Sequence, residues 1–466
     1  MVNRKNRCFF CVFERDKLSL SNKMDRIGAK LSRKMNKMDR QVLKQVMLEN
    51  QVEVERYQVY PRNYFVVNDW NYVFIGVRRA GKSFLLYQRM QELLAKGVGW
   101  DEMLYINFED ERLDGFTKDD FNLILEVHQE LYGKRPILFL DEVQNVEGWE
   151  KFARRLADNK YRVCITGSNA KMLGKEIHTT LGARYLCLYV FPYSFCEYLN
   201  VHGIPFDEHA MVVTDSRAAI IRMFNEYFTG GGYPEAALLV SKRNYLTSAY
   251  QKIYLGDIAG RNGITNTMGL KVMFKKLAES VKQPISFNRI ASVVSSVGGK
   301  LSVTTALKYM DYSKDACLIW PVQNIAAKLA ERESNNKYYF IDNGLLNLLL
   351  FDGKTSLLEN LVAINLIRRF GAEDAVFFYN KDIEVDFYLP MMEWAIQVSY
   401  DIKDESTYKR EIGALEQIDK VLPCRRKTIV VYDEEKSIDL KDGSVVEVVP
   451  VWKFLIRLEQ MEIPVL

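Results

Sequence analysis

The stretch YVFIGVRRAGKSFLLYQRMQELL, residues 72 to 94, decides the fold. Its centre, GVRRAGKS, matches the pattern GxxxxGK[ST] at every defined position, between an apolar strand-like run and a helical one. Glycines let such a loop wrap so that backbone N–H groups converge on phosphate oxygens, and the amino end of the helix adds partial positive charge. We therefore expect nucleotide phosphates to be held by Gly76, Val77, Arg78, Arg79, Ala80, Gly81, Lys82, Ser83 and Phe84.

Two side chains of this loop and two later acids have predicted catalytic or metal-binding roles. Lys82 should meet the β- and γ-phosphates, and the Ser83 hydroxyl should ligate Mg²⁺. Downstream, the run ILFLDE at 137 to 142 has the four apolar residues of a buried strand followed by two carboxylates. Asp141 is predicted to hold the magnesium shell and Glu142 to polarise the attacking water, the alternative being that Glu142 only faces solvent.

Further polar residues are weaker candidates for the same chemistry. The run VCITGSN, 163 to 169, ends in Ser168 and Asn169, which are candidates to orient the water or sense the γ-phosphate; an ordinary strand-to-helix turn explains them equally well. Charge stabilisation in the transition state requires an arginine, from this chain or a neighbouring subunit. Arg184 and Arg261 are the candidates, although either is more commonly a surface or structural residue.

The first half of the chain alternates apolar strands with helical stretches. Strands are expected at 72–76, 103–108, 136–141, 161–167 and 185–191; helices are expected at 38–56, 82–96, 118–132, 149–159 and 169–175. This alternation indicates an α/β fold with a parallel sheet covered by helices on both faces. In such sheets the ligand lies beyond the carboxyl ends of the strands, which is where the phosphate loop and the two acids are expected.

The middle of the chain changes pattern. From about 215 to 283 it predicts helices, broken at GGGYP, 230 to 234. Two short helices at 285–296 and 302–313 and two strands, CLIWPVQNI and KYYFID, joined by a polar turn at 331–336, then follow in the order of a winged helix-turn-helix. The second helix has two lysines and two aspartates, so no strong cationic face is expected, and packing on the nucleotide domain is the alternative to DNA contact.

Together these residues resemble the prokaryotic AAA-type (archaeal-ATPase-like) P-loop ATPases that carry an uncharacterised carboxy-terminal domain. The resemblance spans roughly residues 40 to 420 and also rests on YINFED (105–110), LFLDEVQNVEGWEKFARRL (138–156), ITGSNAKML (165–173), VFPYSFCEYL (190–199), GGYPEA (231–236), KYYFIDNGLL (337–346) and EVDFYL with AIQVSY (384–400). It implies ATP binding and a switch-like ATPase.

The last unit, 355 to 466, resembles a restriction-endonuclease-type fold. That chemistry needs a helix acid, a strand acid and an acid-x-Lys on the next strand to bind Mg²⁺ and activate water. Glu359 and Asp386 occupy the first two places, but the third reads Gln397-Val398-Ser399, which favours a degenerate fold that binds without cleaving. Ordinary structural contacts explain the two acids equally well. A lysine from elsewhere would have to replace the missing cation, and the candidates are Lys381 and Lys403.

Charge and cysteine content limit which cellular compartment and which classes of partner are expected. Residues 1 to 44 hold 13 Lys/Arg against four acids, whereas the remainder holds 51 against 56. A basic tail is typical of a nucleic-acid or membrane-surface arm, but a later translation start is preferred because the tail has no apolar periodicity. Seven scattered cysteines indicate buried thiols in a reducing compartment, and no run approaches the ~20 apolar residues of a membrane helix. We expect a cytoplasmic protein.

These observations divide the chain into a basic tail (1–37), an AAA-type P-loop core (38–212), a helical and winged-helix region (213–354) and a nuclease-like α/β domain (355–466). The predicted function is an ATP-hydrolysing switch that uses Mg²⁺ and controls contact with a nucleic acid or protein partner. An ATP-gated, metal-dependent DNA nuclease is the alternative, and a module that holds ATP structurally is the third hypothesis. Assembly into a homo-oligomer stays open.

Overall fold

The computed structural model describes residues 38–64, 69–168, 180–297, 300–371 and 374–462. Its first sheet has five parallel strands in the order β2-β3-β4-β1-β5. They are β1 (Tyr72–Ile75), β2 (Met103–Asn107), β3 (Ile137–Asp141), β4 (Val163–Gly167) and β5 (Leu186–Tyr189). The three central strands β3, β4 and β1 are fully buried, as expected inside a parallel sheet. Of the two edge strands, β2 is almost wholly buried, and β5 alternates in exposure. The predicted α/β parallel sheet is confirmed.

Four helices of the predicted pattern pack around this sheet. They are α2 (Arg40–Arg56), α3 (Lys82–Ala95), α4 (Phe121–Tyr132) and α5 (Trp149–Asp158). Helix α3 begins directly after Gly81, whose φ of +93° is a conformation that glycine adopts without strain. The helix expected at 169–175 lies outside the described residues.

A group of helices links the first sheet to the rest of the molecule. It comprises α7 (Phe195–Val201), α8 (Glu208–Val212), α9 (Thr214–Gly230), α10 (Pro234–Ala237), α11 (Lys242–Gln251) and the π-helical segment η7 (Lys252–Gly260). The break expected at the glycine run is present: α9 ends at Gly230, the following residue Gly231 has a φ of +71°, and Pro234 starts α10. The Gly232 N–H donates to Asp342 Oδ2 over 2.7 Å, so this turn is tied to the later part of the chain.

The next unit has the element order α12 (Thr267–Glu279), β6 (Ile285–Ser286), α13 (Phe287–Ser296), α14 (Val303–Asp315), β7 (Ile319–Asn324), α15 (Leu329–Ser334) and β8 (Asn335–Phe340). Strand β8 pairs antiparallel with both β6 and β7. The prediction of a polar turn at 331–336 was wrong: the sequence LAERES, which is rich in strong helix formers, makes the short helix α15 instead.

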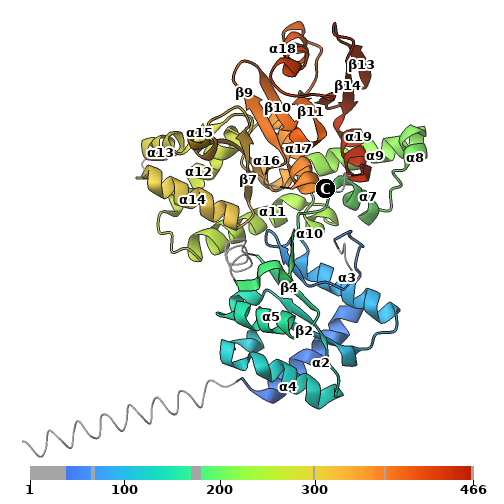
Figure 1. Ribbon diagram of the computed structural model, residues 1–466, viewed down its shortest axis with the longest axis vertical. Helices are drawn as coiled ribbons and strands as arrows, with labels where there is room; N and C mark the ends of the chain where they lie inside the picture. The colour runs from blue at the N-terminus through green and yellow to red at the C-terminus, as the bar shows by residue number, and fades with distance from the viewer. Residues whose placement is uncertain (1–37, 65–68, 169–179, 298–299, 372–373, 463–466) are drawn as a thin grey trace, which may run out of the picture.

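The terminal unit adds α16 (Asn343–Asn347), α17 (Lys354–Phe370), β9 (Phe377–Asn380), β10 (Glu384–Leu389), β11 (Trp394–Val398), α18 (Glu405–Gln417), β12 (Arg426–Val431), β13 (Lys436–Asp439), β14 (Val445–Pro450) and α19 (Val451–Gln460). The order β13-β14-β12-β11-β10-β9-β7-β8-β6 makes one nine-stranded sheet, because β7 pairs with β9. A division at residue 354 stays a prediction. Figure 1 shows the two sheets at opposite ends, with α7, α9, α10, α11 and α17 between them.

Within the described ranges, no helix is long and apolar enough to cross a membrane. The five cysteines that the structure describes, Cys164, Cys187, Cys196, Cys317 and Cys424, are free thiols.

The turn after α9 gives a direct test of the fold. A Cβ atom on Gly231 would lie 2.0 Å from Asp342 Oδ1, and the positive φ there disfavours any side chain. We expect Gly231→Ala to lower the free energy of unfolding by about 2–4 kcal/mol. The matched control is Gly413→Ala in α18, which has open space around its Cβ and should gain about 0.5–1 kcal/mol. Urea unfolding compares them; equal stabilities would contradict the proposed strain.

Candidate functional site

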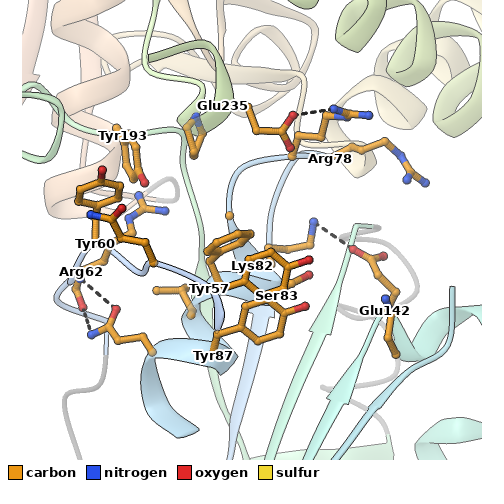
Figure 2. A pocket seen from close by; sticks show the side chains of 18 of the residues that line it. Tyr57, Tyr60, Arg62, Arg78, Lys82, Ser83, Tyr87, Glu142, Tyr193 and Glu235 are labelled. Atoms are coloured by element: carbon orange, nitrogen blue, oxygen red, sulfur yellow. Dashed lines mark hydrogen bonds and ion pairs between the residues drawn. The ribbon is translucent and has the colours of Figure 1, made fainter. Parts of the chain in front are cut away.

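The loop from Gly76 to Ser83 leads from β1 into α3, as its sequence predicts. A Cβ on Gly76 would lie 2.2 Å from the Val190 carbonyl oxygen, so only glycine fits there. Lys82 is 4% exposed, and its Nζ lies 3.4 Å from the Val77 oxygen and 3.3 Å from Glu142 Oε1. The loop therefore encloses one buried ammonium at the start of α3, facing an acid that follows β3 (Figure 2).

Asp141 is the last residue of β3 and is fully buried. Its carboxylate accepts hydrogen bonds from the hydroxyls of Tyr105, at 2.9 Å, and Thr166. Burial, together with the neighbouring Glu142, raises the pKa of Asp141 to about 6, against the opposing hydrogen bonds of Thr166, Ser83 and Tyr105. The structure thus brings Ser83 and Asp141 together, and a cation beside this carboxylate would relieve the cost of its burial.

Glu142 follows in a left-handed conformation, with φ of +48°. Burial alone would raise its pKa, but the Lys82 ammonium and a hydrogen bond from Gln144 outweigh burial, so the pKa of Glu142 is lowered and the group is a carboxylate at neutral pH. The Gln144 amide also lies 3.4 Å from the buried Ser168 hydroxyl, which places Ser168 one side chain away from Glu142. Asn169 lies outside the described residues.

A cavity of about 530 Å³ opens beside the loop. Arg78, Arg79, Gly81, Lys82, Ser83, Phe84 and Glu142 line it, as do residues that the sequence did not reveal: Tyr57, Gln58, Tyr60, Arg62, Tyr87, Asn107, Glu109, Tyr193, Pro234, Glu235 and Leu238. Tyr57 stacks on Tyr87, with ring centroids 5.3 Å apart (Figure 2). The Phe84 ring packs against both of them. The cavity thus has one side made by the loop, with the cations Arg78, Arg79 and Lys82, and an aromatic side.

Arg62 precedes β1 in the chain, and its side chain supports the phosphate loop through a hydrogen bond to Ala80. Its buried guanidinium donates to the Ala80 carbonyl at 3.0 Å and forms a two-armed ion pair with Glu197 at 2.7 and 2.9 Å. Glu197 also lies 3.7 Å from Arg368 of α17. No motif in the sequence identified Arg62, because its partners lie up to 135 residues away.

The two arginines of the loop contact the helices that follow the sheet. Arg78 pairs with Asp257 of η7 at 3.0 Å, and Arg261 lies 3.6 Å from the same carboxylate. Arg79 pairs with Glu235 of α10 at 2.9 Å. Of the two arginines proposed to stabilise transition-state charge, Arg261 is therefore one side chain removed from the phosphate loop.

Arg184 is not brought to the site within this chain, which leaves a neighbouring subunit as the one of its two expected sources that would apply. It precedes β5 and therefore lies at the amino end of that strand, whereas the phosphate loop follows the carboxyl end of the parallel strand β1. Its guanidinium pairs with Asp158 at 2.6 Å and is 37% exposed. Only a neighbouring subunit would place Arg184 near a bound phosphate.

The terminal unit brings Glu359 of α17 and Asp386 of β10 together, with a lysine between them. The Lys337 ammonium, from β8, lies 3.1 Å from both carboxylates and is fully buried. Neither Lys381 nor Lys403, the candidates from sequence, supplies this cation, and both are exposed. The Gln397 side-chain oxygen accepts a hydrogen bond from the Asp386 N–H, and its Nε2 donates to the Glu384 carbonyl, each over 2.9 Å.

This cluster carries two acids for one cation, so its charge is unbalanced. Burial raises the pKa of Glu359 to about 7 despite the neighbouring Lys337, while both carboxylates raise the pKa of Lys337. Below about pH 7 the folded cluster therefore holds a proton on Glu359. Among the described residues, no group of three or more His, Cys, Asp or Glu side chains is arranged to hold a metal ion.

Residues 70–199 match the AAA domain family, and residues 221–356 match a domain of unknown function, DUF8612. With the parallel sheet and the phosphate loop, this defines the class: a P-loop, AAA-type ATPase domain followed by a domain whose role is undefined.

The chain is 32% identical over 451 residues to the uncharacterized protein MJ1544 of Methanocaldococcus jannaschii, which covers 93% of this chain and 99% of that protein. It is 31% identical over 358 residues to an uncharacterized protein of Haemophilus influenzae, covering 73% and 85%. The chain therefore belongs to the same family as MJ1544.

Solved structures share only a distant likeness. The Walker-type ATPase PABY2304 of Pyrococcus abyssi has 13% identity and a TM-score of 0.39, covering 67% of this chain and 95% of that chain. AMPPCP-bound DnaA from Aquifex aeolicus has 13% identity and a TM-score of 0.23, covering 53% and 83%. Scores this low carry no argument about function.

Two arginine–carboxylate pairs of similar length test the support beneath the loop. We expect Arg62→Met to lower the free energy of unfolding by about 3–5 kcal/mol, because it leaves Glu197 buried without its main partner. Arg184→Met breaks a surface pair of 2.6 Å and should cost at most about 1 kcal/mol. Urea unfolding measures both; equal reductions in stability would contradict the support role of Arg62. A loss of turnover in Arg184→Met at unchanged stability would instead indicate action from a neighbouring subunit.

The terminal cluster predicts an unusual dependence of stability on pH. The folded chain keeps a proton on Glu359 up to about pH 7, whereas the unfolded chain releases it near the ordinary glutamate pKa of 4.5. The contribution of Glu359 to the free energy of unfolding therefore falls as pH rises between those two values. Glu359→Gln removes the effect, and its stability relative to the native chain should rise from pH 5 to 7 by about 1 kcal/mol per unit, below the limiting slope of about 1.4 kcal/mol per unit. Urea unfolding across this range measures it. Glu405→Gln, which changes an exposed pair on α18, is the control, and an equal trend in both variants would contradict the assignment to Glu359.

Proposed function

We propose that the chain binds ATP with Mg²⁺ in the 530 Å³ cavity and hydrolyses it. The supporting observation is the position of Lys82, buried in the loop and 3.3 Å from Glu142. The loop backbone and Lys82 would hold the β- and γ-phosphates, Ser83 and Asp141 would ligate the metal, and Glu142 would orient the attacking water. Mg²⁺ would supply neutralisation of the phosphate charge that develops during transfer.

The same pair suggests how nucleotide changes the site. The Lys82 ammonium and the Glu142 carboxylate pair with each other at 3.3 Å. A γ-phosphate would compete for Lys82 and so free Glu142 to accept a water. The aromatic side of the cavity, Tyr57, Phe84 and Tyr87, suits the base. Arg261 is the arginine of this chain that we propose for charge stabilisation, and the switch would control contact with a nucleic acid or protein partner.

The nuclease alternative has less support. A divalent metal would need the place between Glu359 and Asp386 that the Lys337 ammonium occupies, 3.1 Å from each. Gln397, at the position of the third acid, is 2% exposed and hydrogen-bonded to the backbone of β10. This arrangement favours a terminal unit kept for structure or binding.

Steady-state phosphate release tests the proposal. We expect the wild type to turn over ATP with Mg²⁺ and Glu142→Gln to be slower by about 10²–10⁴-fold while still binding nucleotide, because the amide cannot polarise water. Lys82→Ala should have weaker nucleotide affinity as well. Glu53→Gln, at an exposed position on α2, is the control and should be unchanged. A wild type without turnover, or a fully active Glu142→Gln, would overturn the assignment.

A further inference from the structure

Positive charge gathers on one unit of the molecule. Residues 261 to 315 hold nine Lys/Arg against three Asp/Glu, which is a net charge of +6. By contrast, residues 45–260 and 316–466 together hold 42 Lys/Arg against 53 Asp/Glu. The unit built from α12, α13 and α14 is therefore a cationic region on a body that is otherwise acidic beyond the first 44 residues.

Six of these cations are exposed and form no ion pair with any residue that the structure describes. They are Lys271, Lys275, Lys282, Arg289, Lys300 and Lys308. Two acids of the unit are matched locally instead, Glu279 by Lys276 and Asp311 by Lys314. The six charges are thus available to a ligand, and we refer to their surface as the α12–α14 face.

Hydrogen bonds bring parts of this face together. The Asn266 side chain, which caps α12, donates to the Lys300 carbonyl at 3.2 Å, so Lys300 lies at the amino end of α12, near Lys271. The Ser295 hydroxyl of α13 bonds the Leu301 backbone, and Ser302 caps α14. The three helices therefore meet around the turn that carries Lys300, and they lie together in Figure 1.

The other exposed groups of these helices suit a phosphate backbone. Small hydroxyl and amide side chains lie exposed between the cations: Asn288, Ser292, Ser296, Ser302 and Thr304. Such groups donate to phosphate oxygens. The first two turns of α14 contain no acid, since its aspartates begin at Asp311, and they expose Val303 and Leu307, whose methyl groups suit contact with thymine.

We propose that the α12–α14 face binds the phosphate backbone of duplex DNA, with the amino-terminal half of α14 directed toward a groove. The helix–strand–helix–helix–ribbon order is that of folds that place their second helix in the major groove. The inference rests on the proposed function in one respect: it names DNA as the partner whose contact the ATPase would control. Binding itself requires none of the residues of the nucleotide cavity.

The test is fluorescence anisotropy of the full chain with a labelled 24-base-pair duplex, between 50 and 200 mM salt. The variant Lys271→Gln/Lys275→Gln/Lys300→Gln removes three charges from the face. Removing one lysine–phosphate interaction should reduce the slope of log affinity against log salt by about 0.9, so up to about 2.7 in all, with affinity reduced at least tenfold. The matched control, Lys96→Gln/Lys420→Gln/Lys441→Gln, removes three exposed charges elsewhere and should bind within twofold of the wild type.

Each outcome separates this inference from the ATPase proposal. Equal binding by the two triple variants, no binding by the wild type, or polyglutamate bound more tightly than DNA would overturn the proposed DNA face. Phosphate release by the face variant at the wild-type rate would show that the chain is folded and active. If the wild type has no turnover but only the face variant fails to bind DNA, the ATPase proposal fails while the DNA face stands.

Discussion

The rest of the structure depends on the buried ion pair between Arg62 and Glu197. The guanidinium is 5% exposed, and it also donates to the carbonyls of Ala80 and Phe191 at 3.0 and 2.9 Å. A charge so deeply buried is tolerated only while its partners stay in place. The segment before β1, the phosphate loop, the end of β5 and helix α7 are therefore fixed with respect to one another. Since Glu197 also faces Arg368 of α17, the terminal unit shares the same constraint.

A second connection runs from the wall of the cavity to the terminal unit. Tyr193 lines the cavity and donates its N–H to the Gly232 carbonyl at 2.7 Å, and the Gly232 N–H donates to Asp342. Asp342 in turn accepts the N–H groups at the start of α16. Pro234 and Glu235, two and three residues after Gly232, line the same cavity. A ligand that moved this wall would therefore act on backbone that is hydrogen-bonded to the second half of the chain, which is the physical connection that a switch needs.

The sequence could predict what local pattern determines. The phosphate loop, the strand that ends in Asp141 and the parallel sheet follow from short-range apolar and glycine spacing. Arg62, Tyr57 and Tyr193 could not be found in this way, because long-range packing brings them to the cavity. Lys337 was missed for a related reason: β8 reaches Glu359 only because β7 pairs with β9 and joins two sheets. The position of Arg184 was recoverable, since a residue that precedes a parallel strand lies at the edge away from the ligand.

Two of the buried lysines, Lys82 and Lys337, show why one carboxylate site suits exchange of the lysine's partner and the other does not. Lys337 is fully buried between Glu359 and Asp386, and its ammonium pairs with both carboxylates. Tyr339 donates a hydrogen bond to Glu359 at 2.8 Å, and the raised pKa of Glu359 keeps a proton there below about pH 7. A ligand entering there would have to desolvate itself and displace a permanent cation. Lys82 has a single carboxylate partner and lines a cavity. An anionic phosphate would offer Lys82 more charge than Glu142 does, while the released carboxylate would gain a water, so the exchange leaves neither group unpaired. Under the proposed function, the same pairing of ammonium and carboxylate would therefore be structural in the terminal unit and replaceable in the phosphate loop.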